Sequence, residues 1–405
     1  MSNQPTLALM PCFRIKTLPN NQIVITRKFI EAVQMFESLW NGRVKVLIEE
    51  ETGAVDQVDK KVINLNEVPF DMKIVSYDAP DFIENLKGSV VICSADYRQN
   101  HISRLCREYG IPCIYTAEFT LKTHLQIAAV TTPNPVKRMR NRVWRYQQDK
   151  RERLAISLAD GLQCNGFPIF EEYKSLSRNP MVFLDTRITE DMMATREDVE
   201  RRAALRSEDQ PLQLVFSGRL NHMKGADHLI DVALELKRLN VNYHLYISGA
   251  GVLEQPIQQQ IQKKRLGDEV TMLGVPDFKS KFFPFVKSDI DLFICCHRQG
   301  DPSCTYIETM SAGVPIVGYA NEAFEKLNDS SKAGWVVPLD RPDLLARQVA
   351  ELDRNRKEIT AKALTAQQFA QDYTFLDVFR RRVQHAEEVY MRVTAGRSLQ
   401  NVGAI

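Results

Sequence analysis

The chain has 405 residues, of which 44% are hydrophobic and 26% are charged, and its formal net charge is +2. This length exceeds what one ordinary hydrophobic core organises, so the sequence predicts two domains. The composition excludes a disordered or membrane-embedded protein, because no apolar run approaches the roughly 18 to 20 residues of a spanning helix. A net charge near zero gives no indication of nucleic-acid binding. The first ten residues lack the basic start and the long apolar stretch of a signal peptide, which predicts a cytoplasmic protein.

The eight cysteines are scattered along the chain without a C-x-x-C pair. Several lie inside apolar runs such as VVICS and DLFICC, as is typical of free thiols that pack as small hydrophobic side chains in a reducing compartment. Cys295 and Cys296 precede His297, but no second group of ligands follows at metal-binding spacing. The sequence therefore predicts no metal site.

The first half of the chain alternates short apolar runs with helix-like stretches. The apolar runs predict strands at 6–10, 43–49, 73–77, 89–94 and 111–116. Helical periodicity predicts helices at 27–40 and 98–110, and the second ends on Gly110, which suits a left-handed position after a helix. Alternation of this kind predicts a parallel sheet with helices on both faces.

A basic segment lies late in this first half. Residues 136–153 contain eight lysines or arginines against Asp149 and Glu152, and they also carry hydrophobic side chains. Two interpretations are open for the helix that they predict. It is either a solvated flank of the domain, or a surface that rests on anionic lipid headgroups at the inner face of a membrane.

The second half shows clearer boundaries between its predicted elements. Residues 190–211 are charge-rich and poor in large hydrophobic residues, which predicts a junction between domains 1–205 and 206–405. Continuous apolar runs then predict the strands of a parallel sheet buried on both faces, at 212–218, 243–249, 269–274, 291–296, 314–319 and 334–339. Helices follow almost to the end of the chain. Two doubly wound α/β domains create a cleft, and ligands of such sheets bind beyond the carboxyl ends of the strands.

The first motif at such a strand end is SGRLNHMKG, residues 217–225. Arg219 and Lys224 stand there between Gly218 and Gly225. Small residues permit close approach and the two cations match the charge of a diphosphate, although a solvated basic loop would have the same composition. A second, weaker motif is SGAG at 248–251, which contains Gly249.

The richest segment covers residues 291–319. A helix is expected to begin near Ser303, so that the backbone N–H groups of Ser303, Cys304 and Thr305 offer a binding site for a phosphate. Glu308 follows about one turn later. A carboxylate at this position accepts two hydrogen bonds from a ribose diol, or else it is an ordinary solvated helix residue.

These pieces in their order resemble the carboxyl-terminal half of the retaining GT-B glycosyltransferases of family 4, the glycosyl transferases group 1. The segments SGRL-x3-KG, SG-x-G, EVTMLG, ETMSAGVPIVG and GWVVPLD carry the resemblance over about residues 212–356. It implies a GT-B fold, with two Rossmann-like doubly wound domains that face a central cleft, followed by carboxyl-terminal helices.

By this resemblance, Arg219 and Lys224 hold the donor diphosphate, Glu308 binds the ribose, and the backbone around Val275 faces the base. Gly218 and Gly249 belong to the same donor site. The family's E-x7-E motif would place its first glutamate at 300, where this chain has Gly300. Either Asp301 takes the sugar-facing role through a shifted loop, or that contact is missing.

The implied activity is a retaining, metal-independent transfer of a sugar from a nucleotide diphosphate sugar, with UDP as the default, to a glycan or lipid-linked acceptor. No cofactor is implied, since fixed cations and a helix N-terminus stabilise the leaving diphosphate. The D-x-D sequence at 289–291 precedes a strand, so it is interpreted as solvated charge.

In the first domain His124 is a candidate catalytic residue that lines the cleft, and His101 is a second candidate. Either histidine could instead be a satisfied structural residue. Two other functions stay open in the same fold. One is a nucleotide-sugar epimerase or a phosphorylase, for which no motif is found. The other is a non-catalytic protein that binds sugar nucleotides, which Gly300 motivates.

Overall fold

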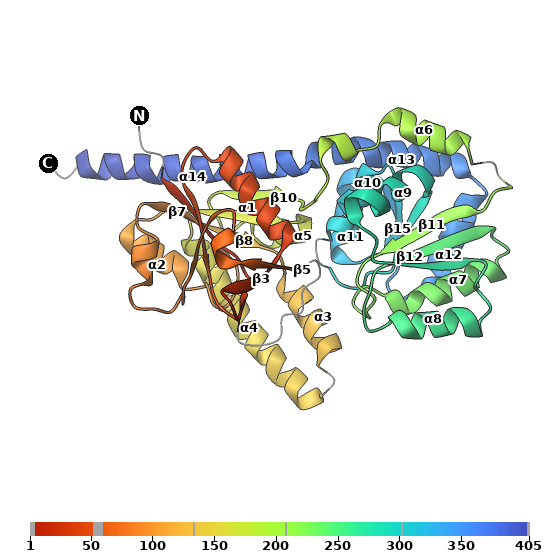
Figure 1. The fold of residues 1–405 in the computed structure, drawn as a ribbon, viewed down its shortest axis with the longest axis horizontal. Coiled ribbons are helices and arrows are strands. Elements are labelled where there is room, and N and C mark those ends of the chain that lie inside the picture. The colour runs from red at the N-terminus through yellow and green to blue at the C-terminus, as the bar shows by residue number, and fades with distance from the viewer. Residues whose placement is uncertain (1–4, 52–59, 133, 207–208, 301–302, 403–405) are drawn as a thin grey trace.

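The computed structural model describes residues 5–51, 60–132, 134–206, 209–300 and 303–402, and it contains two parallel sheets side by side (Figure 1). The first sheet has seven strands in the order β10-β9-β8-β7-β1-β4-β6. Its strands are β1 (Thr6–Met10), β4 (Val44–Ile48), β6 (Asp71–Ile74), β7 (Ser89–Ser94), β8 (Cys113–Ala117), β9 (Gly161–Asn165) and β10 (Pro180–Phe183). Its helices are α1 (Arg27–Leu39), α2 (Ile102–Tyr109), α3 (Leu121–Thr131), α4 (Pro135–Leu158) and α5 (Phe167–Tyr173).

The second sheet has six parallel strands in the order β13-β12-β11-β14-β15-β16. They are β11 (Leu212–Ser217), β12 (Tyr243–Ser248), β13 (Val270–Gly274), β14 (Leu292–Cys295), β15 (Ile316–Tyr319) and β16 (Gly334–Val337). The helices around it are α6 (Arg196–Ala204), α7 (Leu229–Arg238), α8 (Glu254–Lys263), α9 (Phe283–Asp289), α10 (Cys304–Ser311), α11 (Glu322–Ser331), α12 (Pro342–Asp353) and α13 (Arg356–Ala370). Helix α14 (Phe375–Val402) closes the described chain.

Both sheets are buried on their two faces, as the continuous apolar runs predict. In β1, Leu7 packs into one hydrophobic cluster and its neighbour Ala8 into another on the opposite face. In β11, Leu214 and Val215 divide in the same way between two clusters. Because successive strand side chains point to opposite faces, such strands carry apolar residues at successive positions rather than at alternate ones.

Several details of the first half differ from the sequence prediction. The strand expected at 73–77 lies at Asp71–Ile74, and β9 and β10 were not predicted at all. A small antiparallel sheet, β2 (Lys16–Leu18), β3 (Gln22–Thr26) and β5 (Lys60–Asn64), adds to the first core. The end of α3 and the start of α4 project from the rest of the molecule as an arm (Figure 1).

Two helices pack across the limits that the sequence suggested for the domains, although those limits themselves stay a prediction. Helix α6 lies before residue 206 but packs against the second half, where buried Arg202 donates hydrogen bonds to the carbonyls of Lys287 (2.7 Å) and Ala312 (3.1 Å). Helix α14 returns to the first half, where Phe379 packs edge-on against Phe36 of α1. The two halves are therefore joined by two chain crossings.

Candidate active site

The loops after β11, β12 and β14 meet at the carboxyl edge of the second sheet, and glycines make that approach possible. Gly225 has φ +64°, and a Cβ there would lie 1.8 Å from the carbonyl oxygen of Cys296. At Gly249 a Cβ would lie 1.9 Å from the carbonyl oxygen of Gly218. Any larger residue would push these loops apart, so the glycines of SGRLNHMKG and SGAG are needed for the local packing.

The two predicted cations lie on the loop after β11 but differ in their surroundings. Arg219 is exposed, whereas Lys224 is only 6% exposed. The backbone N–H of Lys224 donates to Oδ1 of Asn221 at 2.9 Å, which fixes the turn that carries it. The sheet edge thus presents one solvated and one sequestered positive charge.

A fully buried histidine lies beside Lys224, and no role at this site is predicted for it from the sequence. His297 follows β14, and burial, together with the Lys224 charge, holds the pKa of its imidazole well below the ordinary range. Its Nδ1 lies 3.3 Å from the hydroxyl of Tyr306, while its Nε2 has no hydrogen-bond partner in the described structure. A Cβ built on Gly218 would lie 3.7 Å from this Nε2. A neutral imidazole therefore borders the loop of the predicted diphosphate site.

Helix α10 begins one residue after Ser303, as predicted, although the Ser303 side chain does not cap it with a hydrogen bond. Cys304 and Thr305 form its first turn. Glu308 is 6% exposed, so it is not a solvated helix residue. Its carboxylate accepts two hydrogen bonds from Arg187, from Nε to Oε1 at 2.8 Å and from Nη2 to Oε2 at 3.1 Å.

The segment that supplies Arg187 joins β10 to the second half. Leu184 and Ile188 of this segment are buried in the second core. Between them, Asp185 pairs with Lys28 of α1, and Lys28 also lies 3.1 Å from the Sγ of Cys304. Burial alone would lower the pKa of Lys28, but the Asp185 carboxylate raises it above the ordinary range. This crossing segment therefore ties α1 of the first half to the start of α10.

Helix α3 meets the second half near the position of the missing glutamate. The hydroxyl of Thr123 lies 3.4 Å from the carbonyl oxygen of Gly300, and Gln126 accepts a hydrogen bond of the same length from the Gly300 N–H. His124 lies between them in sequence and packs edge-on against Phe119, with 5.5 Å between the ring centroids. Burial, with the charge of Arg145 added, lowers the pKa of His124 to about 4.

Other candidate residues have plain outcomes. Asp301 lies outside the described residues. Val275 follows β13 and is 65% exposed, and His101 contacts the carbonyl oxygen of Tyr77 at 3.0 Å.

The interpretation of D-x-D as solvated charge is wrong for Asp291. That carboxylate is buried and accepts a 2.8 Å hydrogen bond from the N–H of Gln213, because it immediately precedes β14, which pairs with β11, and burial raises its pKa.

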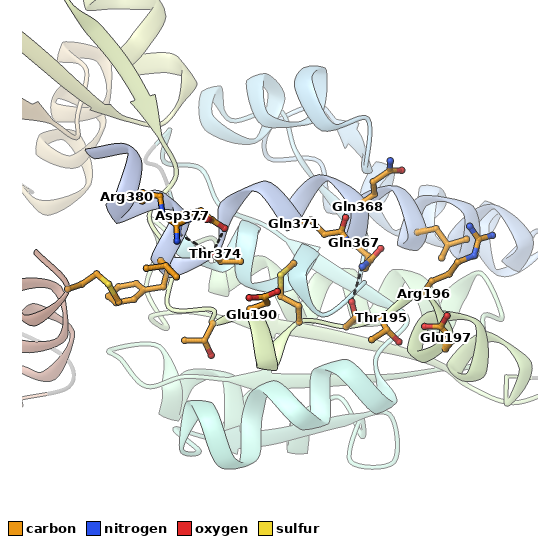
Figure 2. A pocket seen from close by; sticks show the side chains of 17 residues that line it. Glu190, Thr195, Arg196, Glu197, Gln367, Gln368, Gln371, Thr374, Asp377 and Arg380 are labelled. Carbon is orange, nitrogen blue, oxygen red and sulfur yellow. Dashed lines mark hydrogen bonds and ion pairs between the residues drawn. The ribbon is translucent and has the colours of Figure 1, made fainter. Parts of the chain in front are cut away.

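Two hollows adjoin the segment that joins β10 to α6. One of about 330 Å³ opens in the first half, at the carboxyl ends of its strands, and has Lys28, Asp185 and Glu118 in its wall. Figure 2 shows the other, of about 1090 Å³, between the crossing segment and the helices α13 and α14, with Glu190, Gln367 and Asp377 among its lining residues. The larger hollow contains none of the predicted site residues, so its size does not make it the donor site. No group of three or more metal-ligating side chains occurs in the described part of the chain.

Comparison with known proteins relates part of the chain to a family. Residues 198–368 match the family of glycosyl transferases group 1. This part of the chain belongs to that family. WcaL of Salmonella typhimurium, which is named as a colanic acid biosynthesis glycosyltransferase, is 26% identical over 179 residues. The match covers 42% of this chain and 43% of the length of that relative.

Solved structures extend the similarity to both halves. A sucrose-phosphate synthase from Thermosynechococcus elongatus has a TM-score of 0.64 at 14% identity, covering 96% of this chain and 100% of that one. HepE of Anabaena, solved in complex with UDP, has a TM-score of 0.62 at 11% identity, covering 95% and 99%. At these identities the similarity establishes the fold. The two sheets and their helices form a GT-B fold, which confirms the fold predicted from the sequence.

Proposed function

We propose that this protein is a retaining glycosyltransferase that takes its sugar from a nucleotide diphosphate sugar. The observation that carries the proposal is that the loop with Arg219 and Lys224 follows β11 and the start of α10 follows the neighbouring parallel strand β14, so both lie at one edge of the second sheet, with buried Glu308 one turn further along α10. Two cations and the N-terminal turn of a helix suit a diphosphate, and the buried carboxylate suits a ribose diol. The family match over residues 198–368 supports the same function.

Each predicted residue takes one role in this proposal. Arg219 and Lys224 stabilise the negative charge that develops on the leaving diphosphate. Such stabilisation is a large part of catalysis when the protein holds its charged groups in place before the reaction. The backbone N–H groups at Ser303, Cys304 and Thr305 add the positive end of the helix dipole. Gly218 and Gly249 let the donor approach the backbone, and Val275 lies beside the base. The catalytic roles of His124 and Asp301 stay predictions.

The donor is proposed to be a UDP-sugar. Support comes from neighbours of the same fold, because HepE was solved with UDP and with UDP-glucose. A thermal-shift panel of UDP-, GDP- and ADP-sugars tests this choice. A ligand present at 100 times its dissociation constant raises the free energy of unfolding by about 2.7 kcal/mol. Stabilisation by a GDP- or ADP-sugar alone would show that the donor carries guanine or adenine instead of uracil. Stabilisation by none of these ligands would contradict the proposed function.

The acceptor is proposed to be a glycan or a lipid-linked glycan that the arm of α3 and α4 approaches at a membrane surface. Exposed hydrophobic side chains on α4 recur every three or four residues and share one face of the helix: Val136, Met139, Val143 and Tyr146, from 76% to 47% exposed. Residues 135–148 contain five lysines or arginines and no acidic residue. An apolar stripe among cations is the pattern of a helix that lies in an anionic lipid interface.

Flotation with vesicles tests this contact. The parent should float with vesicles that contain phosphatidylglycerol and should not float with pure phosphatidylcholine. Replacing Val136, Met139 and Val143 by serine should abolish flotation, while the control Leu205→Ser, which changes an exposed leucine after α6, should not. Equal flotation of parent and triple variant would contradict the membrane contact. In the described structure, no helix is long and apolar enough to cross a bilayer.

A second candidate function is a protein that binds sugar nucleotides without transferring the sugar. Gly300 favours it, because the residue that would face the donor sugar in the family lacks a side chain here. Release of free nucleotide diphosphate from a bound donor separates the two. Release with any acceptor, or slow release to water, supports the transferase, and binding without release supports the second candidate.

A further inference from the structure

Arg187 contacts Glu308, the carboxylate that is proposed to bind the ribose, and it lies outside the segment that matches the family. Its guanidinium holds both oxygens of Glu308 at 2.8 and 3.1 Å. The flat face of the same guanidinium lies 3.9 Å from the ring centroid of Phe278, which follows β13. A guanidinium that is held by a carboxylate on its edge and an aromatic ring on its face has little freedom to rotate.

The backbone explains why this arginine reaches that carboxylate. The segment from Leu184 to Ile188 buries alternate side chains, so Asp185 and Arg187 point to the other side. Two residues of extended chain span about 6.7 Å, and four residues of an α-helix rise about 6 Å. The crossing segment therefore runs alongside α10 with nearly the same spacing, so that Asp185 lies beside Cys304 and Arg187 lies beside Glu308.

The contact leaves Glu308 able to bind a ligand. An ionised carboxylate offers about four lone-pair sites, and the arginine fork uses one on each oxygen. Two sites remain for the hydroxyl groups of a diol. Removing the arginine would leave a buried carboxylate without its cation, which is costly and also frees the carboxylate to turn.

We propose that Arg187 is a positioning residue that orients Glu308 to accept the 2′- and 3′-hydroxyl groups of the donor ribose. The inference rests on the proposed function, since it assumes that Glu308 binds the ribose. It assigns donor recognition to a residue of the crossing between the two halves. Binding of the nucleotide is thereby linked to the segment that fixes one half relative to the other.

The test compares nucleotides with and without the diol, by calorimetry on the full chain. The ligands are UDP, GDP and ADP and the 2′,3′-dideoxy form of whichever binds best. The variants are Arg187→Met, which keeps much of the side-chain length, and Arg187→Lys, which keeps the charge without the fork. Arg201→Met is the matched control, because it breaks an exposed arginine–aspartate pair on α6.

The parent should prefer the ribonucleotide by at least about tenfold, since hydrogen bonds to a charged group are among the stronger ones. Arg187→Met should bring this preference close to one while it leaves affinity for the dideoxy form within about twofold. Arg187→Lys should fall between, and Arg201→Met should match the parent. In the double variant with Glu308→Gln the preference should fall no further, because both changes remove the same contact.

The outcomes separate the inference from the proposed function. A parent that binds no nucleoside diphosphate, or binds one without preferring ribose, contradicts the proposed site and the inference together. A parent that prefers ribose and an Arg187→Met protein with the same preference contradict the inference alone. If Arg187→Met does not fold, Arg187→Lys decides, and an undiminished preference in that variant also overturns the proposal.

Discussion

The pH dependence of stability can be predicted in magnitude for His124, because burial lowers the pKa of its imidazole. Its pKa is about 4 in the folded protein against 6.5 for an exposed histidine. Between these values the unfolded chain binds a proton that the folded protein does not, so stability is lost as the pH falls below about 6.5. At pH 5 this imidazole alone favours unfolding by about 2 kcal/mol, and at pH 7.5 its effect is close to zero.

The measurement is urea unfolding of the parent and of His124→Gln at pH 7.5 and at pH 5. Other titrating groups act alike in both proteins. Comparing how far the free energy of unfolding falls between pH 7.5 and pH 5 in each protein therefore isolates the contribution of His124. The free energy of unfolding of the parent should fall by about 2 kcal/mol more than that of the variant. An equal fall in both proteins would show that the imidazole is solvated, and the reasoning from burial against Phe119 would be refuted.

Three further predictions concern the chemistry. Arg219→Ala and Lys224→Ala should each lose most transfer activity with an unchanged melting temperature, since a lost charge-assisted contact to a desolvated diphosphate costs about 2 to 5 kcal/mol, and full activity in either protein would remove the diphosphate assignment. Transfer should continue in excess EDTA because the site supplies fixed cations, and a strict need for manganese or magnesium would contradict this. Asp301→Ala should reduce transfer about ten- to a hundredfold and leave affinity for the nucleoside diphosphate unchanged, whereas full transfer would mean that Gly300 marks a lost contact.

The parts of the fold that sequence could predict are those in which one stretch of chain determines its own structure. A strand such as β14 is buried on both faces and apolar throughout, and the turn after β11 needs glycine where loops meet. Strand β9 was missed because it contains Gln163 and Asn165, which are buried yet polar. Gln163 donates to the carbonyl of Arg382 and Asn165 accepts from the N–H of Asp185, and neither partner is visible in the local sequence.

The candidate site divides in the same way. The helix start at Ser303 and the position of Glu308 could be predicted from local signals and a family pattern. Arg187 could not, because it stands 121 residues before Glu308 on a segment without a motif. The place of α14 was also beyond local reasoning. Its apolar residues show that it packs, but only the tertiary structure shows that it returns to α1 of the first half.

The most direct test of the central claim is calorimetric titration of UDP, GDP and ADP into the parent and into Glu308→Gln, with EDTA present throughout. We expect one of these nucleotides to bind the parent and to bind Glu308→Gln about tenfold more weakly, while both proteins unfold at similar urea concentrations. If no nucleotide binds the parent, or if the two proteins bind it equally well, the edge of the second sheet around Glu308 is not the donor site.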